Sequence, residues 1–558
     1  MSSQPQKPLI IQSDRTLMLE VGHPGYVECR DFLSLFAELV KSPEFIHTYR
    51  VTPLSLWNAA ALEVPFKEIT DGLEEFSRYS VPSNVIVDMR EWYETYGKLV
   101  LQKTEVAEDC MELVVTDPRI LERIRNNESL EDFWVEVDTD SPAGLFIPQV
   151  RRGDLKHVLI KAGYPVKDLC GYLEGERFDI TLRDVDLDGN SFQLRDYQKE
   201  AVDLFYCGGE KTGGSGVIVL PCGSGKTIIG LGTMTEISSQ TLIIATNNVS
   251  VAQWRDELLS KTHINETDIG EYTGRIKEIK PITITTYQML THRQTKDSPL
   301  HNLKIFTEHN WGLIIYDEVH ILPAPVFRAT TEIQARRRLG LTATLVREDG
   351  KEDDVFALIG PKRYDVPWKT LESRGYIAEA ICTEYRVPLS PVEELTYAHA
   401  DKRAKFRIAA ENERKKELVC ELLENHAGES ILIIGQFISQ LEKLAKSLGL
   451  PIITGKTKQD DREKLYDEFR KGGINTLVVS KVANFSVDLP DASVMIQVSG
   501  TYGSRQEEAQ RLGRILRPKE HASHFYTLVS KGTVEQTFGS NRQLFLVEQG
   551  YRYQIRYF

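Results

Sequence analysis

Short runs of valine, isoleucine and leucine recur from about residue 190 onward, and a stretch with helical periodicity follows each of them. The runs are VIVL, TLIIAT, ITITTY, LIIYDE and RLGLTAT, then SILIIGQF, LPIITG, TLVVS, SVMIQVS and HFYTLVS. Apolar strands that alternate with helices are typical of a parallel sheet covered on both faces. The sequence therefore predicts the α/β class, with two parallel-sheet domains in tandem over residues 189–365 and 416–558.

The bulk composition is that of a globular chain from a reducing compartment. No apolar run approaches the roughly 18 residues that a membrane helix needs. The first residues lack the basic and then apolar pattern of a secretory signal. The seven cysteines are scattered and form no CxxC pair, so neither a zinc site nor a disulfide framework is indicated. We expect a cytoplasmic protein with no membrane partner.

The first 188 residues have a different pattern. Residues 1–125 combine helical periodicity with turn signals and predict a mainly helical domain, for which a helix-turn-helix module and a generic bundle fit equally well. Within it, residues 8–21 are strand-like and residues 28–42 predict an amphipathic helix. Thr52 is the expected N-cap of a helix that begins at Pro53.

Residues 126–188 predict a small α+β domain. The string DFWVEVDT alternates as a strand does, and residues 144–165 indicate a strand, a turn and a helix. A local basic cluster is formed by Arg151, Arg152, Lys156 and Lys161. Such a cluster is either a solvated face or a nucleic-acid contact, and the pattern leaves both interpretations open.

A phosphate-binding loop is predicted where the first strand of the first sheet meets its helix. The string LPCGSGKT ends in Lys226, which can reach the outer phosphates, and Thr227, whose hydroxyl can ligate Mg²⁺. Leu220 stands where the full pattern has its first glycine, so the match is the shorter GxGKT, and the strand–turn–helix context supports it. The predicted nucleotide-contacting residues are Pro221, Cys222, Gly223, Ser224, Gly225, Lys226 and Thr227.

Two acidic residues end a later apolar strand, in LIIYDEVH. Asp317 is placed to hold Mg²⁺ directly or through water, and Glu318 is placed to polarise the attacking water. Upstream, Arg195 and Gln198 precede the loop, and a glutamine amide can pair with the donor and acceptor edge of adenine. A surface position on its helix is the alternative for Gln198. Together the loop and the acids predict an ATPase that uses Mg²⁺.

Two further strings bear on what the hydrolysis drives. In RLGLTAT the hydroxyls of Thr342 and Thr344 could link the nucleotide site to the second sheet. In QEEAQRLGRILRP, Gln510, Arg514 and Arg517 share one helical face by their spacing. Arginines supplied by a second domain can stabilise charge on the γ-phosphate in the transition state, so these three residues are catalytic candidates.

Taken together, these motifs resemble those of superfamily-two helicases, and in particular the XPB family of nucleotide excision repair helicases. The specific strings are DEVHILPAPVFR, GLTATLVREDGKEDDVFALIGPK and QEEAQRLGRILRPK, and the N-terminal PLSLWNAAALE resembles the bacterial members. The resemblance implies two RecA-like domains that close over ATP and Mg²⁺. It also implies a motor with 3'–5' polarity on DNA, and a damage-recognition-like domain ahead of the first RecA-like domain.

The resemblance also assigns residue roles and marks one departure. The family's RED triad matches Arg347, Glu348 and Asp349, which would act at the DNA junction. Archaeal and eukaryotic members carry a helical thumb between the RecA-like halves. Here residues 366–415 predict a linker with a reduced or absent thumb, which puts the mode of strand separation in doubt.

DNA contacts in such motors go mostly to phosphates along the edges of both sheets. The candidates are Thr286, Tyr287 and Lys456, with Trp254 and Arg255 after the second strand. Packing of Trp254 on the sheet is the favoured alternative to a DNA contact. The C-terminal GYRYQIRYF could stack on bases, but a last strand docked on the second sheet is favoured.

The net charge of −13 argues mildly against a bulk electrostatic binder of nucleic acid, although a groove can be locally basic. The leading interpretation is an ATP-dependent DNA helicase in repair, whose partners are single-stranded and duplex junctions, damaged DNA and a nuclease. Three alternatives remain: a duplex translocase that never separates strands, an RNA helicase, and a nucleotide-gated scaffold that recruits a nuclease or a transcription partner.

Overall fold

The structure is a computed structural model of the 558-residue chain. It describes residues 7–41, 45–105, 109–136, 145–171, 174–210, 213–221, 223–293, 301–306, 308–322, 326, 337–343, 352–366, 368–480, 492–500, 508, 511–516, 521–548, 550–551 and 553–558. The chain divides into two compact units, one built mainly from the residues up to Asp365 and the other mainly from Val366–Phe558. Among the described residues, no helix combines the length and the apolar character needed to cross a membrane.

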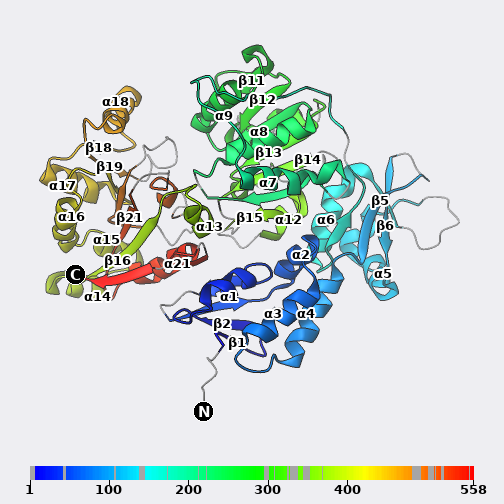
Figure 1. Cartoon of the computed structure of the whole chain (residues 1–558), viewed down its shortest axis with the longest axis horizontal. Helices are drawn as coiled ribbons and strands as arrows, with labels where there is room; N and C mark the ends of the chain where they lie inside the picture. The colour runs from blue at the N-terminus through cyan, green and yellow to red at the C-terminus, as the bar shows by residue number, and fades with distance from the viewer. Residues whose placement is uncertain are drawn as a thin grey trace. The chain divides into compact units, whose positions relative to one another are not determined.

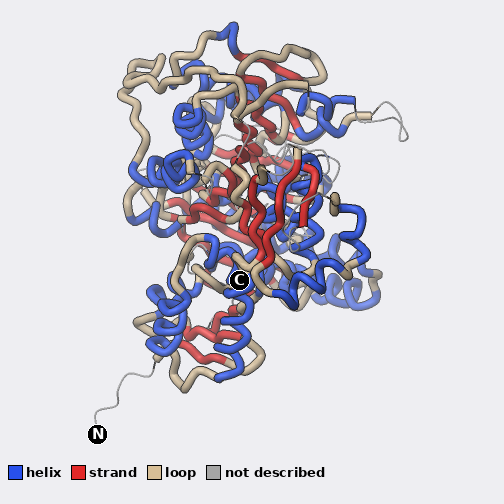
Figure 2. Tube along the Cα trace, turned by 90° about the vertical axis from the view of Figure 1, so that its right-hand side faces the viewer, coloured by secondary structure: helices blue, strands red, loops and turns tan. Residues whose placement is uncertain are grey.

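The N-terminal segment is a four-stranded sheet with four helices (Figure 2). The strands follow the order β1-β2-β4-β3. The elements are β1 (Leu9–Ile11), β2 (Thr16–Glu20), α1 (Tyr26–Leu33), β3 (Glu38–Lys41), β4 (Ile46–Arg50), α2 (Pro53–Ala61), α3 (Phe66–Phe76) and α4 (Ser83–Thr95). The prediction of a mainly helical domain missed this sheet, because its strands span only three to five residues and are too short for a clear period.

Predictions of single elements within this segment agree better with the structure than the prediction of the whole domain. The strand-like stretch 8–21 is the antiparallel pair β1 and β2. The cap is also confirmed, since Thr52 Oγ1 accepts from the backbone N–H of Ser55 at 3.1 Å and the Ser55 hydroxyl oxygen accepts from that of Thr52 at 3.0 Å. The helix predicted over 28–42 is shorter than expected, because α1 ends at Leu33 and β3 takes up the remaining apolar residues.

A second four-stranded sheet follows, in the order β7-β6-β5-β8. Its elements are β5 (Leu99–Lys103), β6 (Cys110–Val115), α5 (Pro118–Arg125), β7 (Leu145–Pro148), α6 (Arg152–Lys161) and β8 (Val166–Asp168), with a 3₁₀ turn at Glu128–Phe133. The small α+β domain therefore begins near residue 98. The predicted boundary at 125/126 was wrong because it divides this sheet, in which β6 pairs with β7 although α5 and the 3₁₀ turn lie between them in the chain. The expected strand at DFWVEVDT is reduced to an isolated bridge between Val135 and Phe146.

Two members of the predicted basic cluster are core residues of this domain. Arg152 is 2% exposed and Lys156 is 7% exposed. Both pair with Asp168 at the end of β8, with N–O distances of 2.7 Å for Arg152 and 3.2 Å for Lys156. Burial alone would raise the pKa of Asp168, but the two cations hold it well below its usual range. Neither side chain forms a solvated face or can reach a nucleic acid, which corrects both interpretations for these two residues.

Replacing Asp168 with asparagine is expected to destabilise the protein by about 2 kcal/mol, because two buried cations lose their carboxylate. The loss is limited because burial lowers the pKa of Lys156 to about 8. Without the carboxylate, the amine can therefore lose its proton instead of remaining an uncompensated buried charge. Calorimetric unfolding should show the loss, with the partly exposed Asp154 on α6 changed to asparagine as the control. The stabilisation by Asp168 is present above the ordinary carboxyl pKa of 3.8 and is lost as the pH falls below it. The difference between wild type and variant should therefore shrink in acid; a constant difference would contradict this assignment.

The first large sheet has seven parallel strands, with helices α8, α9, α10 and α12 on the connections between them and α7 ahead of the first strand (Figure 1). The strands are β9 (Ser215–Val219), β10 (Thr241–Ala245), β11 (Ile269–Tyr272), β12 (Ile282–Thr286), β13 (Leu313–Asp317), β14 (Arg337–Thr342) and β15 (Lys362–Asp365). The helices are α7 (Asp196–Tyr206), α8 (Lys226–Ile237), α9 (Asn248–Lys261), α10 (Tyr287–Thr291) and α12 (Glu352–Ile359). All five predicted strands of this group are confirmed.

The second large sheet also has seven parallel strands. They are β16 (Ala380–Val387), β17 (Ile431–Gly435), β18 (Ile452–Ile453), β19 (Thr476–Ser480), β20 (Val494–Gln497), β21 (Ser523–Ser530) and β22 (Tyr553–Tyr557). The helices of this unit are α13 (Trp368–Ser373), α14 (Pro391–His399), α15 (Lys402–Ala410), α16 (Arg414–Asn425), α17 (Ile438–Leu448), α18 (Gln459–Arg470) and α21 (Val534–Glu548). The favoured interpretation of the C-terminus is confirmed, since β22 pairs in parallel with β16.

The two large sheets share one topology. Ranked by position in the chain, the strands of each lie in the order third, fourth, second, fifth, sixth, first, seventh. The first strand of the second sheet is β16, which falls inside the predicted linker 366–415. That boundary was wrong because β16 pairs with β21, more than a hundred residues away, and only this pairing assigns it to the sheet. The helices α14 and α15 are thus an insertion after the first strand of the second RecA-like domain.

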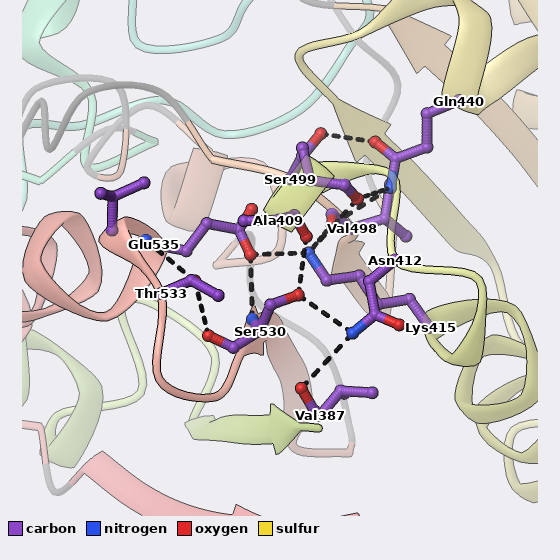
Figure 3. Close-up of polar contacts among 12 residues, drawn as sticks. Val387, Ala409, Asn412, Lys415, Gln440, Val498, Ser499, Ser530, Thr533 and Glu535 are labelled. Atoms are coloured by element: carbon purple, nitrogen blue, oxygen red, sulfur yellow. Dashed lines mark hydrogen bonds and ion pairs between the residues drawn. The ribbon is translucent and has the colours of Figure 1, made fainter. Parts of the chain in front are cut away.

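A buried polar network fixes this insertion to its own sheet (Figure 3). Lys415 Nζ donates to Glu535 Oε2 at 2.8 Å and to the Val498 carbonyl at 3.0 Å. Glu535 Oε2 also accepts from the Ser530 backbone N–H at 2.9 Å. Asn412 donates to the Ser530 hydroxyl oxygen at 3.1 Å. The network thereby joins the start of α16, the ends of β20 and β21, and the first turn of α21.

Candidate nucleotide-binding site

The predicted phosphate loop has the backbone geometry that anion binding needs. It connects β9 to α8, and Gly223 and Gly225 have φ values of 80° and 82°. A side chain at Gly225 would also meet Gln198, since a Cβ there would lie 2.6 Å from Nε2. The Ser224 hydroxyl donates to the Pro221 carbonyl at 2.7 Å and stabilises the turn. Backbone N–H groups at the start of α8 are therefore accessible to an anion; Cys222 lies outside the described residues.

The loop lysine and the strand-end acid lie together, as the sequence predicted. Lys226 Nζ is 2.9 Å from Glu318 Oε1, although 92 residues separate them in the chain. Glu318 follows β13 in a left-handed backbone conformation with φ of 50°. Burial would raise the pKa of Glu318, but Lys226 and His320 hold it below its ordinary value. Glu318 is thus kept ionised beside the lysine predicted to bind phosphate.

Asp317, the last residue of β13, is the second acid. Burial and the adjacent Glu318 carboxylate raise the pKa of Asp317 to about 6. Two adjacent half-buried carboxylates of this kind form a favourable site for a divalent cation, whose charge would stabilise both ionised forms. The cradle of Gly223 and Gly225, Lys226 and the two acids therefore fit a magnesium-bound nucleotide triphosphate.

The segment that follows β13 contacts the end of the neighbouring strand β14. His320 Nδ1 lies 2.7 Å from the hydroxyl of Thr342, and both residues are buried. The hydroxyl of Thr342 thus contacts the histidine of DEVH inside the first unit, and its predicted link to the second sheet stays a prediction. Spacing within the DEVH string could have indicated His320, since it lies only two residues beyond Glu318. Thr344 is outside the described residues.

The predicted adenine-reading residues cap helix α7. Arg195 is its exposed N-cap residue, and its backbone N–H donates to Gln198 Oε1 at 3.0 Å. Gln198 is buried, which excludes the surface alternative. Adenine recognition by Arg195 and Gln198 stays a prediction.

The structure corrects the predicted DNA contacts near the first sheet. Thr286 is buried and its hydroxyl oxygen accepts from the Met289 backbone N–H at 3.0 Å, so it caps α10. Tyr287 is 4% exposed and cannot stack on a base. Trp254 is 1% exposed and packs in the domain, as the alternative interpretation held. Arg255 pairs with Glu271 at 3.0 Å and with Glu266.

The remaining site predictions are in the second unit or outside the described residues. Lys456 is exposed in the turn after β18, where it stays a DNA-contact prediction. Arg514 is half-buried and follows the helical residues 511–513, so the single helix expected over 506–518 ends early, consistent with Gly513 and Pro518. Residues outside the described range are Arg347, Glu348, Asp349, Gln510 and Arg517.

The sequence analysis missed how Asp317 is held. Trp254 Nε1 donates to Asp317 Oδ2 at 3.1 Å, and the Tyr287 hydroxyl donates to the Asp317 backbone carbonyl at 3.1 Å. No spacing rule would have revealed these contacts, since the donors lie 63 and 30 residues upstream of Asp317 in the chain.

Gly230 on α8 provides the space for the Trp254 ring. A Cβ at Gly230 would lie 2.5 Å from Trp254 Cη2. We expect Gly230→Ala to displace the indole and destabilise the first domain by about 1–3 kcal/mol. A lower transition temperature in thermal unfolding should show this. Gly274→Ala is the control, because a Cβ there has open space. Equal unfolding temperatures for both variants would mean that the ring moves aside freely.

Comparison with known proteins agrees with this architecture. The description "ERCC3/RAD25/XPB C-terminal helicase" matches residues 371–556, "Type III restriction enzyme, res subunit" matches 191–347, and "Helicase conserved C-terminal domain" matches 9–137. A fragment of a putative HsdR subunit of a type I restriction enzyme from Vibrio vulnificus shares the fold, with a TM-score of 0.50 and 16% identity over 67% of this chain and 70% of that one. Fold and phosphate site together define a helicase with two RecA-like domains.

Full-length relatives identify the family. The chain is 52% identical to the DNA 3'-5' helicase XPB of Kineococcus radiotolerans, over 98% of this chain and 96% of the relative. It is 48% identical to the protein of that name from Mycobacterium tuberculosis, over 98% and 97%. It is also 34% identical to an XPB subunit of transcription and repair factor IIH from Enterocytozoon bieneusi, over 98% and 92%. The chain belongs to the XPB family of helicases.

Proposed function

We propose that this protein is an ATP-dependent 3'–5' DNA helicase that acts in DNA repair. The observation that carries the proposal is the contact between Lys226 and Glu318, made in a chain that matches XPB helicases along almost its whole length. Bound ATP with Mg²⁺ would supply the phosphoryl-transfer chemistry. Gly223 to Thr227 would hold the phosphates, Thr227 and Asp317 the metal, and Glu318 would take the proton of the attacking water.

Hydrolysis by the purified chain should depend on the nucleic acid present. The test is the ATPase rate with single-stranded DNA, duplex DNA, forked DNA and RNA of matched length. We expect stimulation by the DNA ligands and little by RNA. DNA binding should weaken steeply with salt, since phosphate contacts release counterions. An ATPase rate that no DNA changes would remove the motor from consideration.

A duplex translocase that leaves the strands paired is the second candidate. The observation in its favour is the small size of the insertion α14–α15, two helices of nine residues each that are bound to their own sheet by Asn412 and Lys415. Such a short insertion offers little surface for wedging strands apart. Displacement of a strand from a duplex with a 3' overhang would favour the helicase, and displacement of only a triplex-forming strand would favour the translocase.

Arg514, with Gln510 and Arg517, is proposed to stabilise charge at the γ-phosphate. Arg347, Glu348 and Asp349 are proposed to act at the DNA junction, with Lys456 on the phosphate backbone. The proposals are separable by experiment. Arg514→Ala should lower ATP turnover without weakening DNA binding, and Lys456→Ala should weaken DNA binding and reduce its salt dependence.

A further inference from the structure

A pocket with a volume of about 690 Å³ lies at one edge of the second large sheet. The strands β19, β17, β20 and β21 are neighbours and run parallel, so their amino ends lie side by side at this edge. The residues directly before these four strands all line the pocket: Asn475, Ser430, Ser493 and Ala522. Nucleotides bind parallel sheets of this kind at the carboxyl ends of the strands, so the pocket is at the edge that nucleotides do not use.

A chain of four side chains, in contact through hydrogen bonds, starts and ends at the wall of this pocket. His426 is buried, with Nδ1 at 2.8 Å from Glu429 Oε1 and Nε2 at 2.8 Å from the Tyr526 hydroxyl oxygen. That hydroxyl oxygen lies 3.4 Å from Nδ1 of His524. The centroids of the two imidazole rings are 4.7 Å apart, and the His524 ring is stacked on Tyr526. The ends of the chain, Glu429 and His524, both line the pocket.

The order of the protons along this chain determines what His524 offers to the pocket. A carboxylate only accepts, so His426 donates from Nδ1 to Glu429, and a neutral His426 then accepts at Nε2 from the Tyr526 hydroxyl. A phenol has a single proton, so the oxygen of Tyr526 accepts from Nδ1 of His524. Nε2 is therefore the nitrogen on which His524 gains a proton. Within the described ranges of the chain, Nε2 has no hydrogen-bond partner.

The other polar groups on the pocket wall favour a negatively charged ligand. His521 and Asn475 are exposed there and carry N–H donors. Arg470 is on the same wall and keeps an exposed ion pair with Asp467 at 3.1 Å. Glu429 is the one carboxylate among the described lining residues, and His426 already donates to it. Imidazole, amide and guanidinium N–H groups around a common space are the usual ligands of an oxyanion.

An anion in the pocket would also offset the cost of charging His524. Burial and the neighbouring His426 lower the pKa of His524, whereas Glu429 opposes this effect. Below the ordinary pKa of 6.5 the unfolded chain therefore binds a proton that the folded chain resists, and stability falls with the pH. A negative charge within hydrogen-bonding distance of Nε2 would favour the protonated ring. The other titratable groups near the chain are Tyr385 of β16 and Arg556 of β22, which approach Tyr526.

We propose that this pocket binds a small tetrahedral oxyanion, either free or as the phosphate group of a small molecule, together with a proton on His524. Phe469 and Ile474 supply apolar wall, against which the carbon part of a phosphate ester can pack. Because a proton is bound with the anion, the affinity rises as the pH falls. The proposal is independent of the proposed function, since it involves neither DNA nor the phosphate loop.

The test follows the His524 ring in the full chain by NMR, with histidine labelled with ¹³C at Cε1. The resonance of His524 is the one that disappears in His524→Gln. Sulfate is the probe, because it keeps its charge throughout the titration. About 50 mM sulfate should move the midpoint of the His524 titration to higher pH, and chloride at the same ionic strength should not. The dissociation constant of sulfate should fall about 10-fold between about pH 7.5 and about pH 5.5.

Variants separate the proton from the anion. His524→Gln keeps an N–H donor but cannot be protonated, so sulfate binding, now followed on His521, should become independent of pH. Arg470→Gln should weaken sulfate binding at every pH and keep its pH dependence. His263→Gln, at an exposed position in the first unit, is the matched control and should behave as the wild type does. Lys226→Ala should also keep the response, which excludes the phosphate loop as its cause.

The outcomes decide whether the site exists and what it takes. Equal effects of sulfate and chloride would mean screening by salt only and would overturn the site. A pH-dependent affinity that persists in His524→Gln would overturn the role of His524. Tighter binding of glycerol 3-phosphate than of sulfate would support the proposal and identify phosphate esters as the ligands, and equal binding would support it for the free anion. Should His524→Gln fail to fold, Arg470→Gln, at an exposed position, carries the test by itself.

Discussion

Glu318→Gln should lower the turnover of ATP by about 10²–10⁴-fold, the usual contribution of a positioned general base. Glutamine keeps the shape of the side chain and can still accept a hydrogen bond from Lys226, but it cannot take a proton from water. The wild-type carboxylate is ionised at neutral pH and so has a free lone pair for that proton, since Lys226 and His320 hold its pKa below the ordinary value. The measurement is kcat at saturating ATP and DNA.

Nucleotide binding should survive the same substitution. Lys226 loses its charged partner at 2.9 Å and becomes available to phosphate, so the dissociation constant for ATP should be unchanged or lower. The matched control is Glu271→Gln, which removes an ion-paired carboxylate from the same domain at a distance from the loop. Unchanged turnover in Glu318→Gln would mean that another group is the base, and Asp317→Asn would then be the next variant to measure.

The phosphate site could be predicted from the sequence because its parts are local. Gly223, Gly225 and Lys226 are contiguous, and their strand and helix have clear apolar patterns. The contact of Lys226 with Glu318 followed from fold class alone, since β9 and β13 are strands of one parallel sheet with their carboxyl ends at one edge. The motifs were therefore enough to predict this contact, because every parallel sheet of this fold class brings the carboxyl ends of its strands to one edge.

Other features depend on pairings that no local pattern contains. The strand β16 lies inside the segment that was predicted to be a linker, because only its pairing with β21 places it in a sheet. Arg152 and Lys156 were predicted as surface cations, since their burial depends on Asp168, which lies on another element. Tyr287 was taken for a DNA contact because its position at a strand end is correct, while the direction of its side chain is set by packing against Asp317.

The identical strand order of the two large sheets bears on how the motor is built. Their equivalent first strands, β9 and β16, lead into different structures. The first is followed by the phosphate loop and the second by the insertion α14–α15. Polar contacts buried in the second unit hold the insertion against the sheet. Removing these contacts should weaken the packing of the insertion on its own domain.

Lys415→Met should destabilise the second unit by about 3–5 kcal/mol, because it leaves the buried Glu535 without a counter-charge. Both side chains are almost fully buried, and Lys415 donates to Glu535, Val498 and Ala410. Methionine has a similar length and fills the space, so the loss reports the charge and the hydrogen bonds. Differential scanning calorimetry of the full chain should show the affected transition at a lower temperature.

The control is Lys416→Met, an exposed position next along α16, which should change stability by less than about 0.5 kcal/mol. In the double variant Lys415→Met with Glu535→Gln, the uncompensated charge is gone, so part of the lost stability should return. Such a recovery would locate the cost in the buried carboxylate. A double variant less stable than Lys415→Met alone would instead assign the main stabilising role to the bond that Glu535 accepts from the Ser530 backbone, which holds the first turn of α21 against the end of β21.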